Sequence, residues 1–483
     1  MFRTFLACLL VCLVLAPARA QPAAPPASPA PGPALPAPGP ALPAPVTTPP
    51  QQGMPLTLEQ AVATAIAANP SLQAARESVD IARDQLSGAR AQKGPSVGSS
   101  VVYTRVDRVP SISTFVPSPT SPLGFELRTF SLGKEENVDA QTTFGLPVYS
   151  GGALSAGIRA ARHGVVAAKA AAARSEQQVA YAVRQAYYGV LTAMDATTVA
   201  RQALAAAEEQ LRVARAFVQA GTAPQFDVLR AEARTAEARQ QVTLGANGES
   251  IARAALNNAM GVPQEWTFNL TTPLRREPTA KDLEQLQQAA LAARPDLAQF
   301  RANEQALRQG IVAARASRLP SVGLSWTLSA PVNETTFAVG GWTLAIAANF
   351  NLFDSGRTRA RIRESQDRLQ QIQAFTNQLR QAVTFEVKQA YLNLNTAQEQ
   401  LVTAAAELRA ADEALRIAQV RYQAGISTTV EVIDAQVARQ SAANSYNAAT
   451  YNYNLALAQL DLALGAQVAP GAAPITVPPT KER

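Results

Sequence analysis

Three carboxylates beside two similar stretches are the residues best placed to act chemically. Asp227 lies in "FVQAGTAPQFDVLRAE", and Glu431 and Asp434 lie in "RYQAGISTTVEVIDAQ", 204 positions further on. Each Gln-Ala-Gly is a turn signal, so the acids would lie in the first turns of the helices that follow. Several copies of such a carboxylate around a narrow axis would attract cations and resist anions.

A structural role competes with this chemistry. Thr428 and Glu431 have the spacing of a capping box, and acids near a helix N-terminus are stabilised by the macrodipole. The residues alone leave both roles open for Glu431. Asp434 lies one turn further into the helix and is less suited to capping.

Most other chemistry is excluded by composition. The chain has one histidine, His163, and its two cysteines, Cys8 and Cys12, lie in an apolar leader. No glycine-rich phosphate loop follows a strand, and paired acids such as Glu208 and Glu209 lie on a heptad-patterned helix. We therefore expect no catalytic residue, no metal site and no cofactor, and hence no enzyme.

The chain is predicted to be exported. Residues 1–20 carry Arg3, an apolar run and an Ala-Arg-Ala ending, which together are typical of a signal peptide. No small-residue lipobox precedes a cysteine, so no lipid anchor is expected. A Pro-rich spacer follows over 21–55 and a Pro-rich tail over 466–483. The net charge is +7, and the sequence has no long run of Lys and Arg residues. This argues against nucleic acid as a partner.

The rest of the chain is a tandem duplication. "NPSLQAARESV" from Asn69 matches "RPDLAQFRANE" from Arg294 at an offset of 225, and later motifs match at an offset of 204. We assign the first repeat to 56–261, a linker to 262–281 and the second repeat to 282–465. The first copy carries 21 extra residues, which we place in a Pro/Ser-rich loop within 106–137.

Each repeat contains two strands of alternating pattern. They are expected at about 96–106, 138–148, 321–330 and 341–352. In the second copy Val, Leu and Trp alternate with Ser and Thr, a pattern typical of strands that face lipid on one side and water on the other. Four strands with open edges cannot lie in lipid, so the sheet must close with strands of other chains.

Long helical hairpins complete each repeat, at 153–260 and 356–464. Large residues recur every seven positions from Val387 to Tyr422 and alternate with alanines such as Ala390 and Ala397. A helix uninterrupted for about 65 residues is about 100 Å long. The two Gln-Ala-Gly turns therefore lie at the far tips of the hairpins.

In this arrangement the chain resembles the TolC family of outer-membrane efflux proteins. The motifs are "NPSL", "LPSVGLS", "NLFDSGRTRARI", "YQAGISTTVEVIDAQ" and "LALAQLDLALG". The resemblance implies an α+β membrane protein that forms a homotrimer. Each subunit would contribute four strands to a 12-stranded β-barrel, which would be surrounded by outer-membrane lipid. A periplasmic α-barrel of hairpins would continue it. The implied partners are a periplasmic adaptor and an inner-membrane transporter.

The resemblance also assigns roles at the tips. It implies that Glu431 and Asp434 form acidic rings at a closed entrance, and that Tyr422 links to Asp227. Ser427 stands where the family pattern has a locking arginine. It further implies that the adaptor docks on the turns, at Gly221, Thr222, Gly425 and Ile426.

The predicted function is thus the exit duct of a tripartite pump or of type I secretion, passing substrate from the transporter across periplasm and outer membrane. Drugs, metal ions and proteins stay open as substrates. The alternative is a periplasmic adaptor or coiled-coil scaffold of an export complex. Adaptors normally carry one hairpin within β-rich domains, whereas this chain has two.

Overall fold

The computed structural model describes residues 53–117, 119, 124–131, 135–275, 282–333, 336–337 and 341–466. These residues belong to one compact unit, Gln52–Arg483. The signal peptide, most of the Pro-rich spacer and the tail beyond 466 lie outside the described residues.

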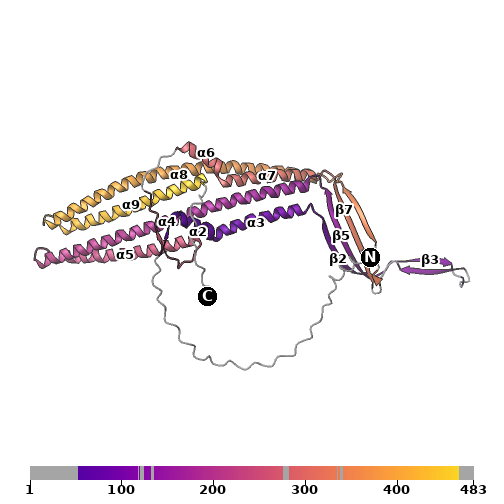
Figure 1. The fold of residues 1–483 in the computed structure, drawn as a ribbon, viewed down its shortest axis with the longest axis horizontal. Helices are drawn as coiled ribbons and strands as arrows, with labels where there is room; N and C mark the ends of the chain where they lie inside the picture. Colours follow the sequence, from indigo (N-terminus) through magenta and orange to yellow (C-terminus); the bar gives the residue numbers. More distant parts are fainter. Residues whose placement is uncertain are drawn as a thin grey trace, which may run out of the picture. The chain divides into compact units, whose positions relative to one another are not determined.

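Two long helical hairpins dominate the described residues (Figure 1). The first is formed by α4 (Ala153–Gln219) and α5 (Gln225–Met260), and the second by α8 (Arg357–Gln423) and α9 (Thr429–Leu464). Corresponding helices have equal lengths, 67 residues for α4 and α8 and 36 for α5 and α9. The predicted pair of hairpins is confirmed.

The heptad positions form the core of these hairpins. In α8 Val387, Leu394 and Leu401 are at most 4% exposed, and Ala390 and Ala397 are buried between them. Alanine at alternate seam positions allows close approach of the neighbouring backbone. Tyr453 of α9 packs into the same cluster. The seam is partly buried at Leu408, Ala411 and Leu415 and is buried again next to the turn, at Ala418 and Tyr422.

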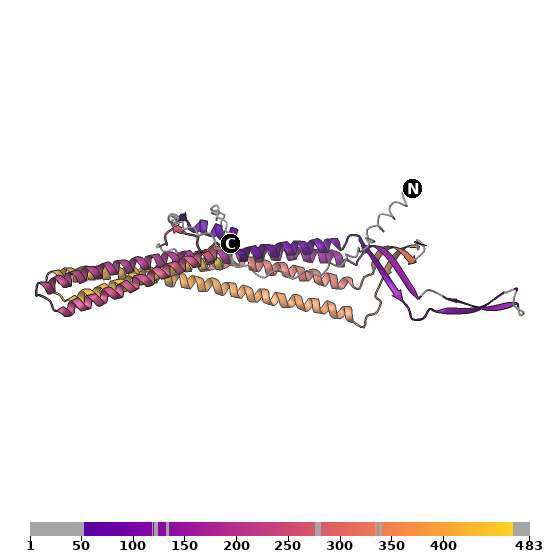
Figure 2. The same cartoon turned by 90° about the horizontal axis from the view of Figure 1, so that it is seen from below.

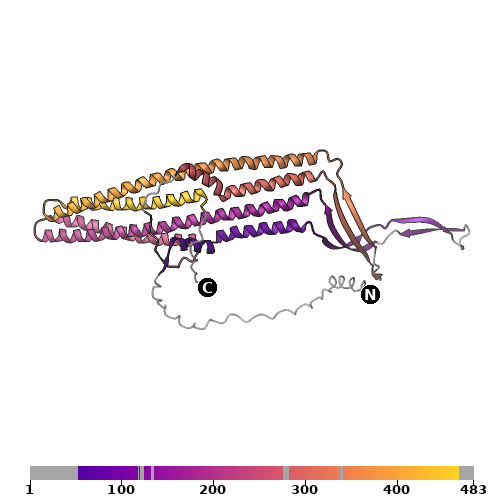
Figure 3. The same ribbon diagram turned by 45° about the horizontal axis from the view of Figure 1, so that its top comes forward.

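Four shorter helices of the described residues pack beside the long helices of the hairpins. They are α2 (Leu58–Ala68), α3 (Pro70–Ala91), α6 (Leu283–Ala293) and α7 (Pro295–Ala316). Thr57 and Gln60 form a capping box at the start of α2, and Asn69 caps α3 with Pro70 in its first turn. Helices α3, α4, α7 and α8 lie side by side in that order (Figure 3). No helix in the described ranges has the length and apolarity that a bilayer span requires.

A sheet of antiparallel strands joins the two repeats (Figure 2). Its main order is β2 (Ser96–Arg105), β5 (Glu136–Tyr149), β7 (Ser321–Asn333) and β9 (Trp342–Asn349), and the short β8 (Thr336–Phe337) also pairs with β7. Strands β5 and β7 come from different repeats and form the centre. Strands β2 and β9 are the outer strands of this path.

The register places apolar residues of all four strands on one face. One row across the sheet is Val97, Phe144, Trp326 and Leu344, and the adjacent row is Gly98, Thr143, Thr327 and Thr343. Successive rows point to opposite faces of a sheet. Apolar side chains on this face are exposed, including Ile346 (75%) and Val97 (70%), and no described residue covers them. The predicted two-sided character of the sheet is confirmed.

Two further strand pairs correct the sequence-based organisation. The predicted Pro/Ser-rich loop contains a separate hairpin of β3 (Ser111–Pro117) and β4 (Phe125–Ser131), so the loop assignment was wrong there. Alternating Ile, Phe and Val within it support strand pairing despite the prolines. The spacer was extended too far, because β1 (Met54–Leu56) pairs in parallel with β6 (Phe268–Leu270) of the linker.

Candidate functional site

Both hairpin turns have the same backbone structure. Gly221 and Gly425 have φ of 74° and 75°, in the left-handed region that favours glycine. The amide of Thr222 donates to the Phe217 carbonyl at 3.0 Å, and the amide of Ile426 donates to the Arg421 carbonyl at 3.0 Å. This is the Schellman pattern that closes a helix C-terminus. Each turn therefore ends the preceding helix with a glycine in the left-handed conformation.

The start of α9 differs from a full capping box. The Glu431 amide donates to the Thr428 hydroxyl at 3.4 Å, as expected. The Glu431 carboxylate instead accepts a 2.7 Å hydrogen bond from the Ser427 hydroxyl and lies 3.7 Å from Nη1 of Arg421. Sequence reasoning missed Arg421, which supplies a cation beside Glu431 although Ser427 replaces the family arginine.

Tyr422 ties the two hairpin tips together. Its side chain is 7% exposed, and its ring packs edge-on against Phe217 of α4 with centroids 5.5 Å apart. Its hydroxyl accepts a hydrogen bond from the Thr429 hydroxyl at 3.1 Å. Asp227 lies partly exposed in the first turn of α5. Among the described residues no hydrogen bond joins Tyr422 to Asp227, so the structure does not bring this pair together within one subunit.

The outermost surface of the tips is apolar as well as acidic. Ile426 is 68% exposed on one turn, and Phe226 is 65% exposed beside the other. Asp434 is exposed one helical turn beyond Glu431. A Cβ atom added at Gly221 or Gly425 would meet no atom within 4 Å. The turns thus offer an open, smooth surface on which another backbone can approach closely.

A second polar cluster, which sequence reasoning missed, holds the C-terminus of α9. The Arg294 side chain is 3% exposed and pairs with Asp296 and with Glu386 of α8. Its guanidinium also donates to the Ala463 carbonyl at 3.2 Å, and Arg174 of α4 donates to the Leu462 carbonyl at 2.9 Å. Cations placed there satisfy the free carbonyls of a helix end.

The first repeat has the neutral counterpart of this arrangement. Asn69, which aligns with Arg294, donates from its amide to the Ala259 carbonyl at 2.9 Å. Gly261 and Gly465 end the two helices, with φ of 73° and 70°. A Cβ at either glycine would lie within 2.9 Å of the opposing capping residue. Both glycines are therefore required by conformation and by close packing.

Charge interactions shift the pKa values in the buried cluster. Burial alone would raise the pKa of Asp296, but the hydrogen bonds and charge of Arg294, together with Arg174, hold it below the usual value of 3.8. Burial, followed by the nearby charge of Arg294, lowers the pKa of Arg174. Asp296 therefore stays ionised well below neutral pH, as the pairing with Arg294 requires.

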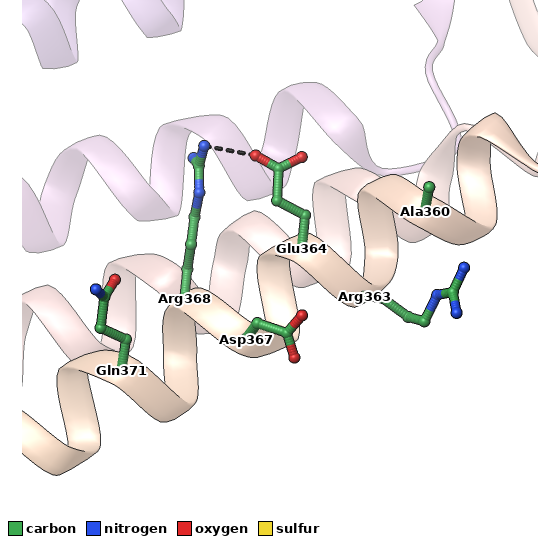
Figure 4. A pocket seen from close by; sticks show the side chains of 6 residues that line it. All are labelled: Ala360, Arg363, Glu364, Asp367, Arg368 and Gln371. Carbon is green, nitrogen blue, oxygen red and sulfur yellow. Dashed lines mark hydrogen bonds and ion pairs between the residues drawn. The ribbon is translucent and has the colours of Figure 1, made fainter.

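The described residues contain no group of three or more side chains able to hold a metal ion. One surface hollow lies along α8, lined by Ala360, Arg363, Glu364, Asp367, Arg368 and Gln371 (Figure 4). Its lining comes from a single helix, and Glu364 pairs with Arg368 at 2.6 Å. This hollow is a groove between exposed side chains, and we assign it no catalytic chemistry.

Known proteins share both the sequence and the fold. The "Outer membrane efflux protein BepC" of Brucella suis biovar 1 (strain 1330) is 25% identical over 235 residues, 47% of this chain and 50% of that protein. "Protein CyaE" of Bordetella pertussis is 32% identical over 156 residues, 32% of this chain and 33% of that protein. The chain thus matches half or less of the length of these curated relatives.

The structural comparison and the family match each cover more of the chain than these two relatives do. A crystal structure of CusC superposes with a TM-score of 0.69 at 18% identity, covering 84% of this chain and 91% of that chain. The sequence model of the outer membrane efflux protein family matches residues 61–262 and 286–466, one segment in each repeat. The chain belongs to the outer membrane efflux protein family and is a protein of the outer membrane.

Proposed function

We propose that this chain forms the exit duct of an export pump, as a homotrimer that crosses the outer membrane and the periplasm. The observation that carries the proposal is the sheet. Among the described residues its apolar face is uncovered, and its outer strands β2 and β9 each pair on one edge alone. In lipid such edges must be paired, so strands of further copies close the sheet into a barrel.

The helices support the same mode of assembly. Helix α8 lies at one side of the helical layer, and α5 lies at the other side near the turns. Both carry exposed apolar side chains, including Leu244 and Ile251 of α5 and Phe385 and Val402 of α8. Exposed apolar patches on helices favour burial against another subunit. Three copies would give twelve strands and a helical tube around one lumen.

The gate is proposed at the periplasmic tips. In a trimer, Glu431 and Asp434 would form rings around the axis, and Tyr422 and Asp227 would hold neighbouring helices at the entrance. The support is their position: both acids are exposed in the first two turns of α9, beside the turn at Gly425. A ring of carboxylates at a constriction attracts cations and blocks at high cation occupancy.

The partners are proposed to be a periplasmic adaptor and an inner-membrane transporter. The adaptor would dock on Gly221, Thr222, Gly425 and Ile426. These residues lie on two turns of equal structure, which expose backbone and an apolar side chain. The duct carries substrate passively and performs no chemistry. The transporter provides the energy and selects the substrate.

Membrane assembly and conductance test the duct. We expect the protein in the outer-membrane fraction as an SDS-sensitive trimer, forming channels in planar bilayers that are blocked by multivalent cations. The Glu431→Ala, Asp434→Ala double variant should lose this block. A soluble periplasmic monomer would refute the duct, and an unchanged cation block in the double variant would refute the acidic ring alone.

Efflux measurements test adaptor docking. Gly221→Trp and Gly425→Trp place bulk on both turns, whereas Asn at the same positions tolerates the left-handed conformation and serves as the control. We expect the Trp variants to form trimers but to lose efflux, and the Asn variants to retain it. Normal efflux in both Trp variants would contradict docking at the turns.

A further inference from the structure

Unpaired cations gather where α8 leaves the sheet. Arg357, Arg359, Arg361 and Arg363 occupy alternate positions in the first two turns of α8, and all four are exposed. Within the described ranges, none of them forms a salt bridge, although Arg357 interacts electrostatically with Asp354 beside the start of the helix. By contrast Arg368, one turn further along, is paired with Glu364 at 2.6 Å. We call these four arginines the α8 quartet.

The quartet contains like charges at helical spacing. Arg357 and Arg361 are four residues apart, as are Arg359 and Arg363, so each pair repels along one side of the helix. Helix propensity does not require this pattern, because glutamine or glutamate would favour the helix as well. The repulsion is relieved if negative groups from outside the chain lie between the arginines.

The other helices that meet the sheet end in the same way. Helices α3 and α7 end just before β2 and β7, and α4 begins just after β5, so four helix ends lie at one end of the sheet. Two exposed cations lie near each of these three ends, and no ion pair engages them among the described residues. They are Arg90 and Lys93, Arg159 and Arg162, and Arg315 and Arg318. Together with the quartet they form the basic girdle.

The girdle adjoins an exposed apolar belt. Leu352 and Phe353 are 86% and 83% exposed between β9 and α8, and Val148 is 63% exposed at the end of β5. Apolar and aromatic side chains at this level are typical of a barrel at the edge of the hydrocarbon layer. The cations therefore lie at the level of lipid head groups.

We propose that the basic girdle binds the phosphates of anionic phospholipids in the periplasmic leaflet of the outer membrane. This inference rests on the proposed trimeric duct. The occupant is identified by charge and depth, because arginine binds phosphate with two parallel hydrogen bonds and the neighbouring belt is apolar. An acidic protein would match the charge but not the apolar belt. The girdle thus selects the lipids that surround the duct.

Lipid selectivity in vesicles provides the test. The full-length trimer is reconstituted with spin-labelled phosphatidylglycerol or phosphatidylcholine, and the motionally restricted fraction of each label is measured. We expect wild type to prefer phosphatidylglycerol by at least about fivefold, the value for one cation at a charged surface. The preference should fall in about 1 M salt, where the screening length is about 3 Å.

Matched variants separate charge from folding. Replacing the α8 quartet by glutamine should remove most of the preference, and replacing it by lysine should retain most of it. The control replaces four exposed cations outside ion pairs, Arg201, Arg380, Lys388 and Arg409, by glutamine and should behave as wild type. Conductance of the same vesicles reports the duct independently.

The outcomes are distinct. Equal restriction of both lipids in wild type, as expected if an acidic protein is the true partner, would overturn the girdle while channels still form. So would a quartet variant that matches the control, or loss of the preference in millimolar inorganic phosphate, which would indicate a free-anion site. Absence of conductance in wild type would count against the duct itself.

Discussion

Arg294 and Asn69 occupy matching positions in the two repeats, and each donates to a carbonyl at the end of the second helix of a hairpin. The sequence alignment pairs the two residues. It does not predict that Arg294 is buried, because its partner Glu386 lies 92 positions away and meets it only in the folded chain. Asn69 precedes a proline in a pattern typical of a helix start, but its second hydrogen bond, to the Ala259 carbonyl, is seen only in the structure.

Substitution at these two positions should have unequal effects. Arg294→Ala removes the cation that Asp296 and Glu386 share. Because Glu386 is partly exposed and Arg174 remains 3.8 Å from it, the cost should be below the roughly 3–5 kcal/mol of a fully buried pair but well above that of a neutral cap. Asn69→Ala removes a neutral cap and costs about 1 kcal/mol. Thermal unfolding of the two purified variants, followed by circular dichroism, measures the difference. Equal losses of stability in the two variants would show that the charge of Arg294 does not contribute to the stability of the fold.

Asp296 predicts a defined dependence on pH. Its folded pKa lies below the usual 3.8, so its stabilising effect is present above that value and is lost as the pH falls through the folded pKa. The stability advantage of wild type over Asp296→Asn should therefore be constant from about pH 7 to pH 5 and shrink below about pH 4. Unfolding temperatures of both proteins across this range check it. A loss beginning at pH 6 would contradict the assignment.

At the scale of elements, the sequence pattern predicted which face of a helix is buried. The seam of α8 follows from its seven-residue spacing, because residues at that spacing lie on one face of the helix, and that face packs against α9. The pairing of Met54–Leu56 with Phe268–Leu270 joins segments far apart in sequence, and three-residue strands are too short to show alternation. The β3–β4 hairpin was missed because its prolines and serines resemble a loop.

The β3–β4 hairpin should be removable. It forms a two-stranded sheet of its own, separate from the sheet of β2, β5, β7 and β9. Replacing residues 108–133 by a two-residue Asn-Gly turn should change the unfolding temperature by less than about 4 °C, the shift that about 1 kcal/mol produces in a domain of up to 250 residues. The trimer yield in detergent should be unchanged. Loss of the trimer would show that the hairpin takes part in assembly.

At the scale of the whole molecule, the two faces of the sheet make a directional prediction. Ile346 lies on the apolar face of β9 and its neighbour Ala345 lies on the opposite face. In the proposed barrel, Ile346→Arg places a charge toward lipid and should cost about 2–4 kcal/mol near the bilayer centre, while Ala345→Arg points to the lumen and should be tolerated. Outer-membrane yield of the two variants decides. A reversed order of yields would mean that the faces are assigned the wrong way round.

The sequence and the structure support closure of the sheet for the same reason, which is that the sheet has one apolar and one polar face. Alternation along Val322, Leu324 and Trp326 indicated two unlike faces, and the register shows that neighbouring strands keep them in step. The interactions at the tips could not be predicted in this way. Arg421 lies 3.7 Å from Glu431 across a turn whose geometry the sequence does not specify. This interaction is therefore seen only in the folded chain.

The equal lengths of corresponding helices in the two repeats place both hairpin turns at the same distance from the sheet. Because α4 and α8 have 67 residues each and α5 and α9 have 36, a change in one repeat alone would leave the two turns at different heights. Removing one heptad from all four helices would shorten the subunit by about 10 Å while keeping every seam in register. In the proposed duct, the reach of the subunit into the periplasm is therefore set by the number of heptads in these helices, and a longer reach requires both repeats to lengthen together.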